Sequence, residues 1–135
     1  MKAKVSISCS KDKLKQVRGF VAQMLEANQV PELQKSQVIL AVDEACANAI
    51  IHGNLCDESR EIEMEIELVK KQLQIMIYDI GKFNAHNSKK NNLETLVKQK
   101  RKGGLGLTIM KNIMDEVHFF EKNGIYICSL KKALD

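Results

Sequence analysis

No apolar run in the 135-residue sequence approaches the ~20 residues that a membrane-spanning helix needs. The first residues, Met1–Ser6, also lack the apolar block of a signal peptide and lead into an alternating pattern. With 44% hydrophobic and 28% charged residues, the composition is typical of a globular chain rather than a disordered one. We therefore expect a cytoplasmic protein with a single domain over residues 1–135.

Metal-binding and disulfide patterns are also missing. No two cysteines form a Cys-x-x-Cys pair, and no histidine stands at zinc-ligand spacing from a cysteine. We therefore expect neither a zinc site nor a disulfide framework, but free thiols in a reducing compartment. The four cysteines are Cys9, Cys46, Cys56 and Cys128.

Positive charge is concentrated in one segment and scarce elsewhere. Residues 82–102 contain seven Lys or Arg and one acidic residue, Glu94, so this segment carries +6 while the whole chain carries +4. The remainder is mildly acidic, unlike a nucleic-acid-binding domain that is basic throughout. We expect no direct nucleic-acid partner and no membrane partner.

Hydrophobic periodicity predicts a strand and two helices in the first part of the chain. Residues 3–9 alternate between apolar and polar, which predicts a strand with one buried face. Ser10 can cap a following helix, whose apolar positions recur at helical spacing as far as Leu25. A second helix is predicted from about 31 to 53, because Pro31 suits a first helical turn and a glycine follows at the end.

The second half predicts four strands and a third helix. Strict alternation over Glu61–Leu68 predicts a strand with one buried face and four glutamates on the other, and Leu73–Tyr78 predicts its antiparallel partner. Farther on, the apolar helical run Leu105–Met114 precedes two strands joined by an Asn-Gly turn, Val117–Phe120 and Ile125–Leu130.

The segment between these parts, about 80–104, is rich in Asn, Lys and Gly and is long for a connection inside one domain. Such a loop is typically a functional lid or a disordered segment, and only residues 93–97 indicate a short helix within it. The order strand-helix-helix-strand-strand-lid-helix-strand-strand predicts an α+β fold. We expect a two-layer α/β sandwich, with a mostly antiparallel sheet and helices on one face.

Three polar residues recur every fourth position in the second predicted helix: Glu44, Asn48 and His52. Residues four apart share one line of a helix, and this helix is otherwise almost wholly apolar, which predicts burial. Buried carboxylate and amide groups are costly unless they are paired. The stripe is therefore either a satisfied polar network in the core or one side of a site for a hydrated cation that carries phosphates.

Two further motifs bear on that choice. Tyr78-Asp79-Ile80-Gly81 is either an ordinary turn or a strand end whose carboxylate accepts a hydrogen bond from a ligand amino group. Lys102–Thr108 places three glycines before a helix, as a flexible linker or as a cradle of N–H groups for phosphates. With the stripe, these groups match Mg-ATP, because Mg²⁺ takes few protein ligands and keeps several waters.

The same residues resemble the GHKL superfamily of ATP-binding domains, which histidine kinases, gyrase, Hsp90 and MutL share. Glu44–Gly53 resembles its N-box, Asp79-Ile80-Gly81 its first ATP-box and Gly104–Met110 its second, in matching order and separation. Within the superfamily, the chain is most similar to the bacterial anti-sigma-factor serine kinases. The resemblance covers nearly the whole chain and implies the Bergerat type of ATP-binding fold.

The resemblance implies a role for each matching residue. Asn48 would bind Mg²⁺, Glu44 would be the general base for the substrate hydroxyl, and His52 would be a supporting residue. Asp79 would bind the adenine amino group, and Arg18 would contact protein partners. The other nucleotide-binding residues would be Gly81, Lys102, Gly104, Gly106 and Thr108.

The resemblance also implies an activity and partners. The protein would be an anti-sigma factor and an ATP-dependent protein serine/threonine kinase whose substrate is an anti-anti-sigma factor. It would also bind a sigma factor and form a homodimer. One departure affects this expectation, because the family reads Asp-x-Gly-x-Gly where this chain has Lys82-Phe83 after Gly81. The missing second glycine removes backbone freedom at the first hinge of the lid.

Two other functions stay open. The Lys82-Phe83 departure favours a non-catalytic switch that binds nucleotide or protein, whereas the intact Glu44 and Asn48 favour the enzyme. A histidine-kinase-like ATPase that acts on a separate histidine-bearing partner ranks last, because the sequence shows no obvious phosphoacceptor segment.

Overall fold

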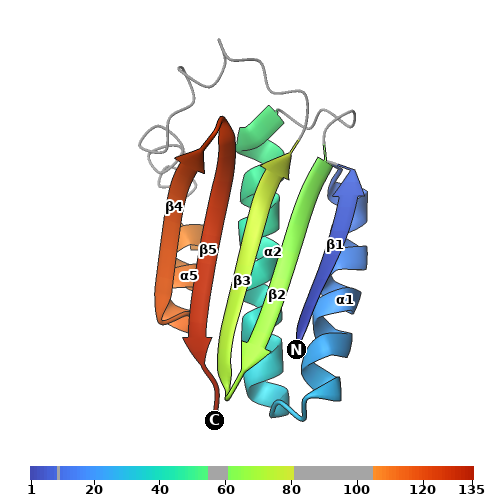
Figure 1. The fold of residues 1–135 in the computed structure, drawn as a ribbon, viewed down its shortest axis with the longest axis vertical. Helices are drawn as coiled ribbons and strands as arrows, with labels where there is room; N and C mark the ends of the chain where they lie inside the picture. Colours follow the sequence, from blue (N-terminus) through green and yellow to red (C-terminus); the bar gives the residue numbers. More distant parts are fainter. Residues whose placement is uncertain (9, 55–60, 81–104) are drawn as a thin grey trace.

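An antiparallel sheet of five strands and three α-helices make up the described part of the computed structural model, residues 1–8, 10–54, 61–80 and 105–135. In chain order the elements are β1 (Lys2–Ser8), a 3-10 turn (Lys11–Lys13), α1 (Leu14–Ala27), α2 (Glu32–Asn54), β2 (Glu61–Val69), β3 (Gln72–Ile80), α5 (Leu105–Ile113), β4 (Glu116–Lys122) and β5 (Ile125–Ala133). The strand order is β1-β2-β3-β5-β4, and the helices lie on one face of the sheet (Figure 1). This confirms the predicted two-layer α+β fold and the order of its elements.

Predicted and observed boundaries differ most before α1. The Ser10 hydroxyl accepts a hydrogen bond from the Asp12 N–H at 3.3 Å and so caps the 3-10 turn. Helix α1 begins after Lys13, where no side chain caps it, so the predicted cap of the helix acts one turn earlier. The Pro31 carbonyl accepts a hydrogen bond from the Lys35 N–H at 2.9 Å, as expected for the residue before a helix. The predicted lid and its short helix at 93–97 lie outside the described residues, apart from the end of β3.

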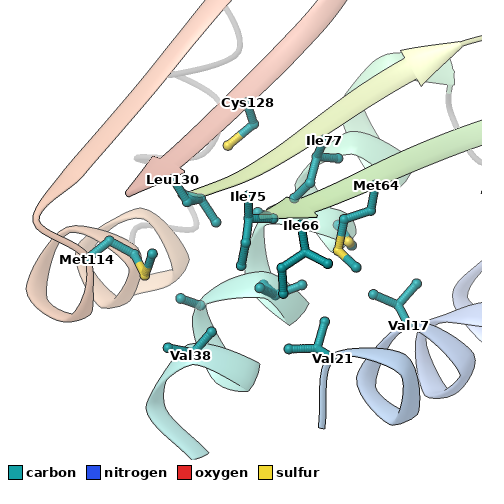
Figure 2. Packing of buried hydrophobic residues seen from close by; sticks show 14 of the residues in the cluster. Val17, Val21, Val38, Met64, Ile66, Ile75, Ile77, Met114, Cys128 and Leu130 are labelled. Atoms are coloured by element: carbon teal, nitrogen blue, oxygen red, sulfur yellow. The ribbon is translucent and has the colours of Figure 1, made fainter. Parts of the chain in front are cut away.

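The core fills the space between the sheet and the helices. Figure 2 shows Val17 and Val21 of α1 and Val38 of α2 facing Ile66 and Ile75 of the sheet, and all five are buried. Each such side chain contributes about 1.5–3 kcal/mol by leaving water. Although α2 has 23 residues, neither it nor any other described helix is long and apolar enough to cross a membrane.

Two of the four cysteines belong to this core. Cys46 of α2 and Cys128 of β5 are buried free thiols. Burial raises the pKa of both, to about 12 for Cys128. Both are therefore protonated at neutral pH and act as small apolar groups. Cys9 and Cys56 lie outside the described residues.

The outer face of the sheet carries the predicted glutamates of β2. Lys4 of β1 lies 3.6 Å from both Glu63 and Glu65, and Lys2 lies 3.4 Å from Glu65. Burial and the neighbouring glutamates raise the pKa of Tyr78 on the next strand. Ion pairs this exposed to water contribute at most about 1 kcal/mol each, so the packed face determines the register more than these charges do.

Two hairpins connect neighbouring strands with two-residue turns, but with different residues. Asn123 and Gly124, between β4 and β5, have φ angles of 54° and 79°, the left-handed pair that a type I′ turn requires. Lys70 and Lys71, between β2 and β3, have φ angles of 51° and 66°. A side chain other than Gly, Asn or Asp is strained in this region by roughly 1–2 kcal/mol.

Replacing the second turn with the first, as Lys70→Asn with Lys71→Gly, should therefore raise the free energy of unfolding by about 1 kcal/mol in urea denaturation. The control is Lys70→Gln with Lys71→Gln, which removes the same two charges and keeps the backbone strain. An equal gain in both variants would assign the effect to charge and would contradict the explanation from strain.

Candidate functional site

The site begins on α2, where the sequence predicts a polar stripe. One side of this helix belongs to the core: Val38, Ala41, Val42, Ala45 and Cys46 are buried. Glu44 is half-buried, and Asn48 retains only 8% of its exposure to solvent. The side chain of His52 lies outside the described residues. The stripe therefore runs from the surface of the helix layer at Glu44 toward the interior at Asn48.

Asn48 has an unusual side chain for so buried a position. Its Oδ1 atom is inaccessible to solvent and accepts no hydrogen bond within the described part of the chain. A buried acceptor left in this way costs about 1–3 kcal/mol, and one in a folded protein needs an explanation such as a bound ion, water or ligand. This favours a ligand site over a satisfied core network.

Asp79 approaches from the sheet. It is the last residue but one of β3 and is 2% exposed. It lies on the helix-facing side of the strand because it follows the buried Ile75 and Ile77 at two-residue spacing. Tyr126 of β5 stands opposite it in the register and is also buried. Sequence reasoning did not single out Tyr126, because its position depends on how β3 and β5 pair. Gly81 lies outside the described residues.

The first turn of α5 is the third element of the candidate site, after α2 and β3. Gly106 is buried and Thr108 is exposed, while Leu107 and Met110 anchor the helix in the core. Helix α5 packs against α2. Lys102 and Gly104, the other residues predicted for this motif, lie outside the described part of the chain.

These three elements converge at one end of the molecule. In Figure 1 the C-terminal end of α2, the arrowhead of β3 and the start of β5 all lie toward the top. Helix α5 leads down to the start of β4, so its first turn also points to this end. The fold therefore brings Asn48, Asp79 and the Gly106 turn from distant parts of the sequence to one end of the helix–sheet interface.

Arg18, the predicted partner-binding residue, lies on a different side of α2. Its Nη1 donates a hydrogen bond to the Asp43 Oδ1 at 2.6 Å, which joins α1 to α2. Nearer the loop between these helices, the Lys35 Nζ lies 2.7 Å from Glu26 and 3.0 Å from Glu32. Hydrogen bonds to these carboxylates raise the pKa of Lys35. The sequence carried no signal for Asp43, because this ion pair joins residues 25 positions apart.

Comparison with protein families identifies the chain. The family model of the histidine kinase-like ATPase domain matches residues 7–128. The chain belongs to this family. The predicted GHKL resemblance is thereby confirmed, and the five-stranded sheet with helices on one face is the fold of this family.

Relatives within the family are anti-sigma factors and serine kinases. The chain is 34% identical over 120 residues to the anti-sigma F factor of Clostridium perfringens (strain SM101 / Type A), an alignment that covers 86% of this chain and 82% of that protein. It is 33% identical over 97 residues to the serine-protein kinase RsbW of Bacillus licheniformis. That alignment covers 68% of this chain and 61% of the relative, so the match spans about three fifths of that kinase.

Solved structures share the fold at low sequence identity. The RsbU and RsbW domains of a Mycobacterium tuberculosis protein match with a TM-score of 0.69 and 13% identity, over 99% of this chain and 32% of that one. The SiaB-SiaC complex from Pseudomonas aeruginosa matches with a TM-score of 0.63 and 13% identity, over 96% and 88%. At this identity the likeness concerns the fold alone.

The buried oxygen of Asn48 leads to a prediction about stability. Asn48→Leu replaces the amide by an apolar group of similar size, so the free energy of unfolding without ligand should stay level or rise by about 1 kcal/mol. Urea denaturation of the ligand-free protein measures this change. Asn28→Ala is the matched control, because the Asn28 Nδ2 donates to the Met24 carbonyl at 2.8 Å, and its removal should lower stability by about 1 kcal/mol. Equal losses in both variants would show that Asn48 is satisfied in the core.

Proposed function

We propose that this protein is an anti-sigma factor that binds Mg-ATP and transfers the γ-phosphoryl group to a serine or threonine of an anti-anti-sigma factor. The family and the names of its relatives support this activity. The observation that carries it is the buried Asn48 Oδ1 at the end of the molecule where Asp79 and the α5 turn meet. The proposal includes a single domain over residues 1–135, a sigma factor as second partner, and a homodimer.

The nucleotide would lie between the sheet and the helices. The Asp79 carboxylate is the acceptor for the adenine amino group, and Thr108 supports the adenine from the first turns of α5. The phosphates belong to the glycine-rich turn, where N–H groups at the start of α5 face them. Gly81, Gly104, Gly106 and Lys102 are the proposed contacts of this part.

The residues present suit Mg²⁺. An amide oxygen is a hard, neutral ligand of the kind that Mg²⁺ accepts beside waters and phosphates, and the Asn48 Oδ1 accepts no hydrogen bond from any described residue. When bound, the cation neutralises charge on the β- and γ-phosphates. Asn48 and the preceding Ala45 and Cys46 are buried, so the packed helix fixes the position of the proposed ligand.

Glu44 would act on the acceptor hydroxyl. It lies four residues before Asn48, which is about 6 Å along the helix axis and on the same side. Glu44 is half-buried, so part of the residue lies at the surface that a protein substrate can reach. Phosphoryl transfer needs mainly positioning and electrostatic stabilisation, so the role of this residue is to accept the proton that the serine or threonine hydroxyl releases.

Nucleotide selectivity tests Asp79. Adenine presents an amino group where guanine presents a carbonyl, so Asp79→Asn should weaken ATP binding by roughly tenfold to a hundredfold and weaken GTP binding less, if at all. Calorimetry with both Mg-nucleotides gives the ratio of dissociation constants, which a general loss of stability would not change. An unchanged ratio would remove Asp79 from the adenine site.

Transfer to a purified anti-anti-sigma protein from the same organism tests Glu44. Glu44→Gln should lower kcat by about a hundredfold or more, while the dissociation constant for Mg-ATP stays within about twofold because the carboxylate acts on the hydroxyl. Glu32→Gln, on the exposed first turn of the same helix, is the control and should transfer normally. Normal transfer by Glu44→Gln would assign the base to another group.

A specific sequence feature favours a second function, a non-catalytic switch. Lys82-Phe83 replaces the flexible end of the Asp-x-Gly-x-Gly pattern, which favours a switch that binds nucleotide without transfer. Tight, Mg²⁺-dependent ATP binding by the wild-type protein with no transfer to any anti-anti-sigma protein would select this alternative.

A further inference from the structure

Helix α2 carries exposed leucines on the same face as Glu44. Five large apolar side chains are exposed among the described residues: Met1, Leu33, Leu40, Val69 and Phe120. Only Leu33 and Leu40 share a helix, with 71% and 45% of their surfaces exposed. They are seven positions apart, which is close to two full turns, so they form one apolar stripe, Leu33–Leu40.

The Leu33–Leu40 stripe leads to the proposed catalytic group. Leu40, Glu44 and Asn48 succeed one another every four residues, and their burial increases in that order from exposed to half-buried to buried. At 1.5 Å per residue, Leu40 lies about 6 Å and Leu33 about 16 Å from Glu44 along the axis. A protein partner that covers the Leu33–Leu40 stripe would therefore reach Glu44, the group proposed to accept the proton of its hydroxyl.

Charges beside the stripe are paired within the protein. On the α1 side, the ion pairs Arg18–Asp43 and Lys35–Glu26 join α1 to α2, and Lys35 also pairs with Glu32 within α2. The Arg18 side chain remains 43% exposed, so a carboxylate on a partner can share it. The open face of α2 before Glu44 therefore carries Leu33 and Leu40 with the uncharged Ser36 and Gln37, and the partly exposed Arg18 guanidinium lies on the α1 side.

We propose that the Leu33–Leu40 stripe is the docking surface for the protein substrate, an anti-anti-sigma factor that places apolar side chains on Leu40 and Leu33 and its acceptor hydroxyl at Glu44. This inference rests on the proposed kinase function. The nucleotide is not expected to cover the stripe. Its adenine base would bind at Asp79 on the sheet, whereas the stripe lies on α2 on the other side of Asn48. A second copy packed stripe to stripe would set the two Glu44 faces against each other and block the substrate.

The decisive variant is Leu33→Ser with Leu40→Ser, measured against the anti-anti-sigma protein used in the transfer assay. Its KM and its dissociation constant should rise at least tenfold, because each leucine loses apolar burial in the complex. The dissociation constant for Mg-ATP should stay within about twofold, since neither leucine contacts the nucleotide in this arrangement. Val69→Ser is the matched control, because Val69 is 49% exposed on the β2–β3 hairpin, outside the helix layer.

Three results would overturn the proposal. Wild-type transfer with an unchanged KM and dissociation constant in the double variant would place the substrate elsewhere while leaving the kinase function intact. Conversion of a wild-type dimer to a monomer by the double variant in analytical ultracentrifugation would assign the stripe to a second copy. Absence of both binding and transfer in the wild type would instead remove the proposed function, and the docking surface with it.

Discussion

The burial of α2 is the constraint on which the rest of the structure depends. The stretch from Val38 to Ala49 is largely apolar, and the helix is covered by the sheet on one side and by α1 and α5 on its flanks. An isolated helix of this kind gains little from hydrogen bonding alone, so its stability comes from packing. Once α2 is buried along the sheet, Asn48 is carried to the end where β3 presents Asp79. The site is therefore a consequence of how the core is closed.

This arrangement places stability and binding on the same helix. Val38, Ala41 and Val42 belong wholly to the core, whereas Asn48, farther along, has a buried oxygen that no described residue satisfies. Such a group is costly in the free protein and favourable when a ligand supplies the missing partner. A chain selected for stability alone would carry an apolar residue at position 48. The retained amide is therefore better explained by binding than by folding.

The fold could be predicted from the sequence because apolar residues recur with a period of two in the strands and with helical spacing in the helices. Alternation over Glu61–Leu68 and helical spacing in the first helix leave little freedom in the choice of element, and the Asn123-Gly124 turn indicates one hairpin. Which residues of different elements contact each other was harder to predict. The pairing of Asp79 with Tyr126 follows from strand register, and the Arg18–Asp43 contact follows from the packing of two helices. Neither leaves a periodic signal in one sequence.

Neither the hydrophobic pattern of the sequence nor the packing of the core explains why leucines are exposed on α2. The face that points away from the sheet also carries Ser36 and Gln37, which shows that polar residues are accepted there without loss of the helix. Leu33 and Leu40 are not among the buried residues of the core, and they expose apolar surface to water. A feature that the fold does not need, aligned with Glu44 on the same face, is most simply explained by a partner that covers it. One helix thus contributes the core on one side, and in our proposals it also carries the metal ligand Asn48 near one end and the substrate surface on the face left open.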